Sequence, residues 1–145
     1  YGYTTEDPEL TAKMMDKRFK KMGSFLRELE NMETIKIYGP GEADITILGW
    51  GSTKGPIREA MKLLNSGGVG VNYLQILYLH PFPTSKVQGV LKSAKRTVVV
   101  ENNKTSLLTG LIRENTLMDV DHKILKYDGR PFNPGALAGK IGEVL

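Results

Sequence analysis

Cysteine is absent from the 145 residues of this chain. That absence excludes disulfides, zinc sites built on thiolates and any iron–sulfur cluster held by the chain's own thiolates, so redox chemistry must come from other chains. The two histidines stand far apart in the sequence, and no histidine-rich metal spacing, paired carboxylates or nucleophile elbow is present. We therefore expect no catalytic residue and no metal ligand here, and the residues indicate a scaffold more than a catalyst.

Long apolar runs are also absent: none approaches the ~18 residues of a membrane helix, and no charged-then-apolar signal peptide opens the chain. These absences favour a cytoplasmic protein without membrane contact. The basic excess is modest, at 20 Lys and Arg against 16 Asp and Glu. Much of it lies in residues 17–21, which resemble the outer face of an amphipathic helix. A nucleic-acid site would need a wider basic surface with stacking aromatics, so no nucleic-acid partner is expected.

The remaining composition is that of an ordinary globular domain, with 40% hydrophobic and 25% charged residues. The length suits one domain of roughly 100–200 residues. The polar opening, residues 1–9, begins with Tyr and carries a proline, as would a linker to a preceding domain. We expect residues 1–33 to form a linker and an N-terminal helical segment, and residues 34–145 to form an α/β domain.

Residues 11–33 carry apolar side chains at spacings of three and four, which favour helix. Gly23 and Ser24 interrupt this pattern. The sequence therefore predicts one helix up to about Met22 and a shorter one from Ser24, whose hydroxyl would cap it. We expect the first helix to dock on another domain.

Beyond residue 33, apolar β-rich runs alternate with helical segments. Strands are predicted at 34–38, 43–50, 69–79, 96–101 and 120–126, and helices at 56–65, 84–94, 106–116 and 133–145. This alternation implies parallel crossovers and predicts an α/β fold, a three-layer helix–sheet–helix sandwich with a five-stranded, mostly parallel sheet. The tight turn at Gly39-Pro40-Gly41 is too short for a crossover, so the short first strand should be antiparallel, at or near an edge.

The turn after the second predicted strand is rich in glycine (GWGSTKGP, residues 49–56). Small residues, two hydroxyls and a cation before a helix N-terminus make an anion site there a candidate, formed by Gly51, Ser52, Thr53 and Lys54. The turn is neither a P-loop nor a Gly-x-Gly-x-x-Gly motif. A tight strand-to-helix turn with Ser52 or Thr53 as N-cap explains the same residues.

Three other strand exits carry polar or aromatic residues. His80 lies between Leu79 and two prolines, where it serves either acid–base chemistry or the loop's own hydrogen bonds, and Thr84 or Ser85 is expected to cap the following helix. The segment 101–103, an acid and two amides, suits contacts to a ligand or neighbouring loop, or internal loop fixing and capping.

The last exit, residues 126–134, contains an Asp-Gly turn dipeptide beside residue types over-represented at buried protein contacts. It is interpreted as an interface element. The candidate interface residues at these exits are Glu101, Asn102, Asn103, Tyr127, Asp128, Arg130 and Phe132.

Six stretches, in their order and spacing, resemble the alpha subunit of 2-oxoacid:ferredoxin oxidoreductases. They are residues 5–9 (TEDPE), 14–19 (MMDKRF), 49–60 (GWGSTKGPIREA), 74–83 (LQILYLHPFP), 98–103 (VVVENN) and 126–132 (KYDGRPF). The resemblance spans nearly the whole chain. It implies a domain similar to the C-terminal domain of transketolases, preceded in the family by a pyrimidine-binding domain for thiamine diphosphate. One departure is Thr105-Ser106-Leu107-Leu108, where the family usually has Thr-Gly-Gln-Leu.

The resemblance also implies the reaction of the whole enzyme, in which a 2-oxoacid and coenzyme A give acyl-CoA and carbon dioxide while ferredoxin is reduced. Thiamine diphosphate, magnesium and the iron–sulfur cluster would reside mainly on a partner beta subunit or on other chains, with no cofactor bound by this chain. Its partners would be that beta subunit, the N-terminal domain and, through the whole complex, ferredoxin.

These observations favour a domain for subunit assembly and active-site support that is inactive alone. Two alternatives stay open: an anion-binding domain whose 51–54 turn holds a phosphate of coenzyme A, and a stand-alone interaction module. The particular 2-oxoacid is not predicted. We expect exposed apolar surface near Met14, Met15, Phe19 and Phe132, which homodimer formation would cover.

Overall fold

The computed structural model describes residue 2 and residues 4–145. The chain divides into two compact units, residues 1–33 and residues 34–145. The predicted linker at residues 1–9 lies partly outside the described residues, and its last two residues already belong to the first helix.

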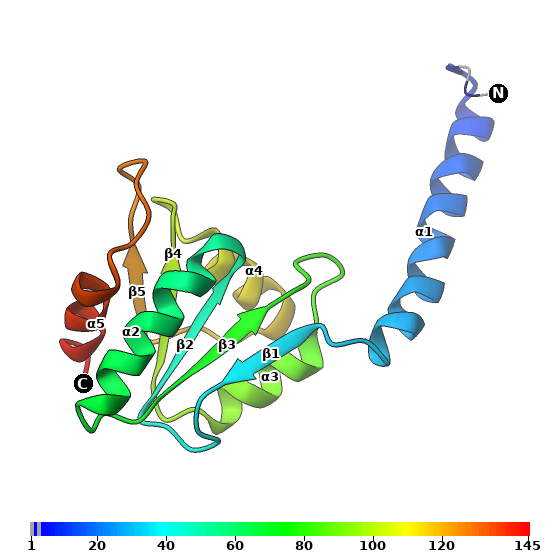
Figure 1. The fold of residues 1–145 in the computed structure, drawn as a ribbon. Coiled ribbons are helices and arrows are strands. Elements are labelled where there is room, and N and C mark those ends of the chain that lie inside the picture. The colour runs from blue at the N-terminus through cyan, green and yellow to red at the C-terminus, as the bar shows by residue number, and fades with distance from the viewer. Residues whose placement is uncertain (1, 3) are drawn as a thin grey trace. The chain divides into compact units, whose positions relative to one another are not determined.

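The first unit contains one helix, α1 (Pro8–Glu30). Asp7 caps it, because its carboxylate accepts a hydrogen bond of 2.8 Å from the Leu10 N–H. The predicted break at Gly23 and Ser24 is wrong: α1 runs through both residues without interruption, as Figure 1 shows. A single glycine costs a helix only about 1 kcal/mol, and its neighbours are mostly good helix formers. No helix in the described part of the chain is both long and apolar enough to cross a bilayer.

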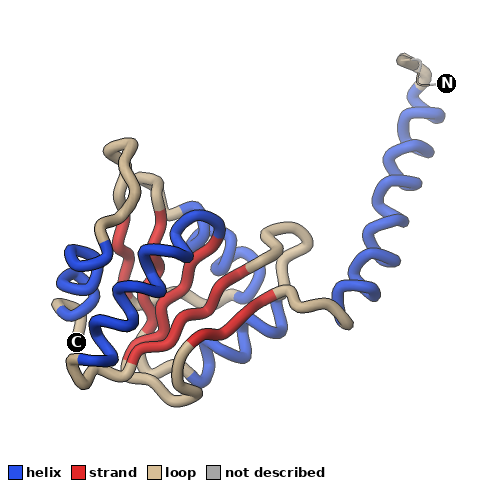
Figure 2. The backbone as a smooth tube through the Cα atoms, viewed as in Figure 1, coloured by secondary structure: helices blue, strands red, loops and turns tan. Residues whose placement is uncertain are grey.

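The second unit is built on a five-stranded sheet. Its strands are β1 (Ile35–Tyr38), β2 (Ile45–Trp50), β3 (Val71–Ile76), β4 (Thr97–Glu101) and β5 (His122–Leu125). They lie side by side in one sheet (Figure 2), in the order β1-β3-β2-β4-β5. β1 is antiparallel to β3 at one edge, and the other pairs are parallel. The predicted mixed sheet and its antiparallel edge strand are confirmed.

Helices cover both faces of this sheet. They are α2 (Lys54–Ser66), preceded by the short 3-10 helix η1 (Gly51–Thr53), α3 (Thr84–Ser93), α4 (Leu107–Thr116) and α5 (Pro134–Gly142). One apolar core joins α2 and α5 to the sheet, and a second joins α3 and α4 to it. Since β3 and β4 are buried along their whole length, as strands covered on both faces must be, the three-layer prediction is confirmed.

Two predicted details are wrong, the end of the third strand and the cap of helix α3. The third strand ends at Ile76 and not at Leu79, because its ladder partners end there, at Ile35 in β1 and Trp50 in β2. The predicted cap of α3 by Thr84 or Ser85 is also wrong, since Pro83 occupies the N-cap position and no side chain caps the helix.

Candidate functional site at the carboxyl edge of the sheet

The four parallel strands end at one edge of the sheet, at the top of Figure 1. From β2 the chain moves to β3 on one side, and from β3 it crosses to β4 on the other side of β2. Open α/β sheets place their crevices at such a reversal of strand order. A cavity of about 220 Å³ lies there, lined by Trp50 at the end of β2, by residues 51–53 after it and by Asn102 and Asn103 after β4.

The turn after β2 is tight because its glycines permit it. A Cβ at Gly49 would stand 2.8 Å from the Ile57 side chain, and Gly51 has a φ of +56°. The Thr53 hydroxyl donates a hydrogen bond of 2.8 Å to the Trp50 carbonyl. These contacts hold the chain in a sharp bend between strand and helix.

The structure brings only part of the predicted anion site together. Gly51, Ser52 and Thr53 line the cavity, but Lys54 is not among its lining residues. The Lys54 ammonium lies 5.5 Å from the centre of the Tyr38 ring. Thr53 stands at the N-cap of α2, yet its hydroxyl bonds to Trp50 and caps no helical N–H. Anion binding at this turn stays a prediction.

Glu101, at the end of β4, is fully buried. Its carboxylate accepts hydrogen bonds of 3.0 Å from the Leu108 N–H, 3.2 Å from the Ser106 hydroxyl and 2.7 Å from the Asn103 amide. It therefore caps α4 from the preceding strand, while Ser106, at the N-cap position, provides no side-chain cap. A side chain buried in this way is not available to a partner, so Glu101 is wrong as an interface residue.

Asn102 and Asn103 differ in their roles. Asn103 fixes the loop through Glu101 and through a hydrogen bond of 3.4 Å that its side-chain oxygen accepts from the Leu107 N–H. The exposed Asn102 donates a hydrogen bond of 3.4 Å to the Arg130 carbonyl. Asn102 thus links the exit of β4 to the loop after β5.

The loop at residues 126–133 exposes Tyr127, whose ring centre lies 5.7 Å from the Lys104 ammonium. Asp128 accepts hydrogen bonds from the Lys126 ammonium and, at 3.1 Å, from the Arg130 N–H. The contact with Lys126, followed by the Arg130 N–H, lowers the pKa of Asp128 below its ordinary value. The loop is therefore folded on itself and presents Tyr127 and the Arg130 side chain outward.

Phe132 does not belong to this exposed set. It is only 6% exposed and packs in the core shared by α2 and α5. The sequence placed it on the surface because it lies in the loop after the last predicted strand. The chain turns inward there to begin α5, which Asn133 caps through the Ala136 N–H at 3.0 Å. Phe132 is therefore wrong as exposed apolar surface, while its role as an interface residue stays a prediction.

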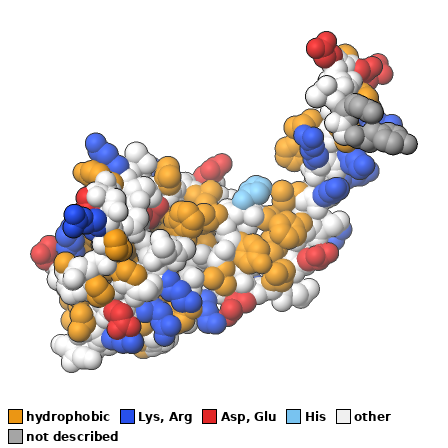
Figure 3. Space-filling view, turned by 45° about the horizontal axis from the view of Figure 1, so that its top comes forward, with side chains coloured by type: hydrophobic (Ala, Val, Ile, Leu, Met, Phe, Trp, Pro, Cys, Tyr) orange, Lys and Arg blue, Asp and Glu red, His pale blue; other side chains and the backbone are white. Residues whose placement is uncertain are grey.

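An exposed apolar row runs along the carboxyl edge, and sequence reasoning missed it. In the order of the sheet the row is Leu77 just after β3, Trp50 at the end of β2, Leu107 at the start of α4, and Tyr127 just after β5. These residues are exposed by 39%, 39%, 64% and 64%. In Figure 3, which brings the upper side of Figure 1 forward, hydrophobic side chains gather on this face. Trp50 was placed at the end of the second predicted strand and Leu77 inside the third, so neither was considered as exposed surface.

The fold does not bring the two histidines together at this edge. His80 is exposed after β3, whereas His122 lies at the other end of the sheet, at the start of β5. In the part of the chain that the structure describes, no group of three or more His, Cys, Asp or Glu side chains could hold a metal ion. The edge presents apolar, amide and cationic groups, which suit binding between proteins.

The fold defines the structural class of this chain. A split-gene transketolase is similar to this chain in fold, with a TM-score of 0.50 at 18% identity over 74% of the chain, so the architecture is that of a transketolase C-terminal-like domain. The model of the pyruvate:ferredoxin oxidoreductase core domain II family matches residues 43–134. The chain belongs to that family.

Individual relatives agree with this assignment. The alpha subunit of 2-oxoacid:ferredoxin oxidoreductase 2 from Aeropyrum pernix is 34% identical over the whole chain, which spans about a quarter of that relative (23%). The 2-oxoglutarate:ferredoxin oxidoreductase of Magnetococcus marinus, solved with 2-oxoglutarate, coenzyme A and succinyl-CoA, is 30% identical, with a TM-score of 0.79 over 98% of this chain and 24% of that one. The alpha chain of a probable 2-oxoacid ferredoxin oxidoreductase from Thermoplasma acidophilum is 37% identical over 78% of this chain and 97% of its own, with a TM-score of 0.56. The resemblance to these alpha subunits is confirmed.

Proposed function

We propose that this chain serves as an assembly and active-site support domain in the alpha subunit of a 2-oxoacid:ferredoxin oxidoreductase. The whole enzyme would convert a 2-oxoacid and coenzyme A to acyl-CoA and carbon dioxide and reduce ferredoxin. The domain would bind the beta subunit and the rest of the alpha subunit through the carboxyl edge of its sheet. The cytoplasm is the compartment we assign to it.

The observation that carries this proposal is the apolar row at the carboxyl edge. Large side chains at the exits of all four parallel strands are exposed together, although loops at such exits are usually polar. A contiguous apolar surface rimmed by polar groups marks a protein contact. Asn102, Arg130 and Lys104 supply such polar groups beside the row.

Cofactor chemistry falls to other parts of the enzyme in this proposal. The chain has no cysteine to hold an iron–sulfur cluster, and its described residues offer no cluster of three metal ligands. The iron–sulfur cluster and the magnesium of thiamine diphosphate would accordingly be bound outside this domain, and in this proposal thiamine diphosphate and coenzyme A are bound there too. Its own residues would orient the neighbouring domains that carry them.

The test is charge insertion into the row of the full-length alpha subunit, purified with its partner subunit. Trp50→Glu and Leu107→Glu each place a charge in a surface that assembly would bury, so we expect the dissociation constant between the subunits to rise at least about tenfold. Sedimentation velocity measures the association, and 2-oxoacid-dependent reduction of ferredoxin should fall with it.

Leu117→Glu is the matched control. Leu117 is 91% exposed, lies at the opposite end of α4 from Leu107 and is not at the carboxyl edge. It should leave assembly and ferredoxin reduction unchanged. If both edge variants assemble as tightly as the wild type, the proposed role is wrong.

A further inference from the structure

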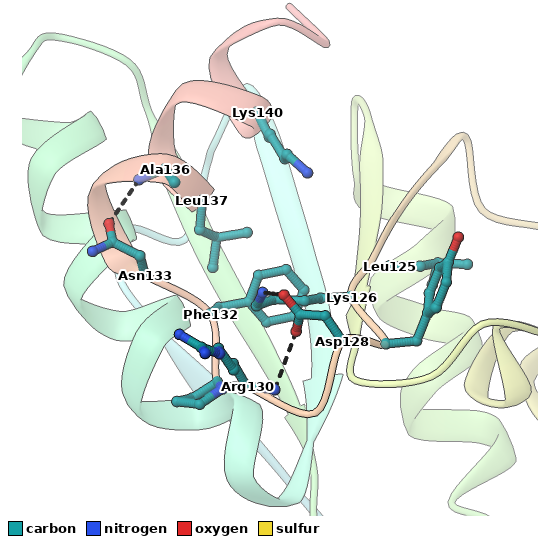
Figure 4. Close-up of a pocket in the computed structure, with 11 residues that line it drawn as sticks. Leu125, Lys126, Asp128, Arg130, Phe132, Asn133, Ala136, Leu137 and Lys140 are labelled. Atoms are coloured by element: carbon teal, nitrogen blue, oxygen red, sulfur yellow. Dashed lines mark hydrogen bonds and ion pairs between the residues drawn. The ribbon is translucent and has the colours of Figure 1, made fainter.

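A groove of about 530 Å³ lies between the end of β5, the loop at 126–133 and helix α5. Figure 4 shows the residues that surround it, with the loop on one side and Lys140 of α5 on the other. The floor is apolar: Phe132 and Leu137 are buried there, and Leu125 and Ala136 line it beside them.

Cations stand around this floor. Lys126, Arg130 and Lys140 line the groove together with one carboxylate, that of Asp128. Lys126 is ion-paired with Asp128. In the part of the chain that the structure describes, neither the Arg130 guanidinium nor the Lys140 ammonium makes a hydrogen bond or ion pair with another residue. Two exposed cations therefore remain without a counter-charge beside an apolar floor.

We infer that this groove receives an acidic segment of a partner protein, with a bulky apolar side chain on the floor and carboxylates beside Arg130 and Lys140. This inference rests on the proposed assembly role and specifies the chemistry of the partner. The guanidinium is suited to bidentate carboxylate binding, and complementary charge around an apolar anchor is a common interface design.

The groove continues the carboxyl edge. Four of its lining residues, Lys126, Tyr127, Arg130 and Pro131, also line a neighbouring cavity of about 480 Å³. That cavity reaches Ser52 in the turn after β2, Pro56 in the first turn of α2 and Asn102 after β4. A partner lying along the apolar row therefore has a continuous path into the groove.

A protein segment fits this groove better than a small anion does. The lining residues that are buried, Phe132 and Leu137, are apolar, so no buried polar group orients a small ligand. The polar groups are all at the rim. This arrangement, with an apolar centre and a charged periphery, is that of a protein interface.

The test uses the full-length alpha subunit in complex with its partner subunit. The double reversal Arg130→Glu with Lys140→Glu should raise the subunit dissociation constant about tenfold at low salt, because two attractive charge pairs become repulsive. The difference should shrink at high salt, where exposed charges are screened. Lys92→Glu, on the exposed side of α3, is the control for a charge reversal away from the groove and should have no effect.

A photoreactive benzoylphenylalanine in place of Lys140 identifies the segment. In the purified complex it should cross-link to a peptide that carries several Asp or Glu residues around a large apolar one, as mass spectrometry would show. Cross-linking to a neutral or basic peptide, or none at all, overturns the inference.

Three other results are decisive. If the double reversal leaves assembly intact while Trp50→Glu disrupts it, the inference about the groove fails and the assembly role stands; if neither variant disrupts assembly, both fail. If the reversal instead abolishes binding of inorganic pyrophosphate without changing subunit association, the groove takes a small anion and the inference is wrong.

Discussion

Glu101 shows how a residue that looks like a binding group can be occupied within its own domain. Its carboxylate accepts hydrogen bonds from three kinds of donor, an amide, a hydroxyl and a backbone N–H, between the end of β4 and the start of α4. Among the described residues no cation forms an ion pair with it, and the donors together with the helix N-terminus compensate for its burial. Glu101 therefore holds the end of β4 and the start of α4 together at the carboxyl edge.

Glu101→Gln should destabilise the chain by roughly 1–3 kcal/mol, because an amide replaces one acceptor oxygen with a donor facing other donors. Urea unfolding at constant pH measures this change. Glu59→Gln, which removes only an exposed ion pair with Lys62, should shift stability by less than about 0.5 kcal/mol. If Glu101→Gln lowers the free energy of unfolding as little as the control does, the carboxylate does not cap α4.

Among the elements, β4 and β5 are joined by more than their ladder. The Asp121 carboxylate, just before β5, accepts hydrogen bonds of 2.7 Å from both the Thr97 N–H and the Thr97 hydroxyl at the start of β4. The hydroxyl contact is the main reason that the pKa of Asp121 is lowered, and the backbone contact lowers it further. The edge strand is thus fixed at its entry by a charged hydrogen bond.

This contact makes a pH-dependent contribution to stability. Because the folded pKa lies below the unfolded value of about 3.9, the contribution is present above about pH 4 and is lost as the pH falls through the folded pKa. Asp121→Asn should therefore make the decline in unfolding free energy between about pH 5 and 2 shallower than in the wild type. Thermal melts over this range measure it, with Thr97→Val expected to give a similar but smaller effect. A profile as steep as the wild type's in both variants would contradict the assignment.

At the scale of the whole molecule, apolar surface is left uncovered. Large side chains of α1 are 41–70% exposed, namely Leu10, Met14, Met15, Phe19, Phe25 and Leu26. The first unit contains no other described helix or strand to cover them. An amphipathic helix with so much exposed apolar area is expected to be buried in a contact with a neighbouring domain or a second copy.

We therefore predict that the 145-residue chain self-associates through α1 in solution. Phe19 is the most exposed apolar side chain of the helix. Phe19→Glu should therefore raise the dissociation constant of this self-association at least about tenfold. Sedimentation equilibrium over a range of concentrations measures this. Lys13→Glu is the control on the same helix. A wild-type chain that stays monomeric at all concentrations would exclude this role for α1.

The sequence predicted the sheet, because runs such as TVVVE and ITILGW have only one stable environment, a strand covered on both faces. It also located the exits that form the carboxyl edge. It failed where a contact between distant residues decided the outcome. Phe132 turned out to be buried, and Leu77 turned out to lie outside β3 because the ladder partners of that strand end at Ile76.

What the sequence by itself determined is therefore the order of the elements, the parallel crossovers and the absence of any thiolate chemistry, since these depend on local periodicity and residue type. Only the tertiary structure decided which exit residues are exposed. Strand order brought Leu77, Trp50, Leu107 and Tyr127 into one row, and the same packing buried Glu101 and Phe132. Exposure depends on which residues, distant in the chain, come to lie above a side chain, and no local pattern contains that information.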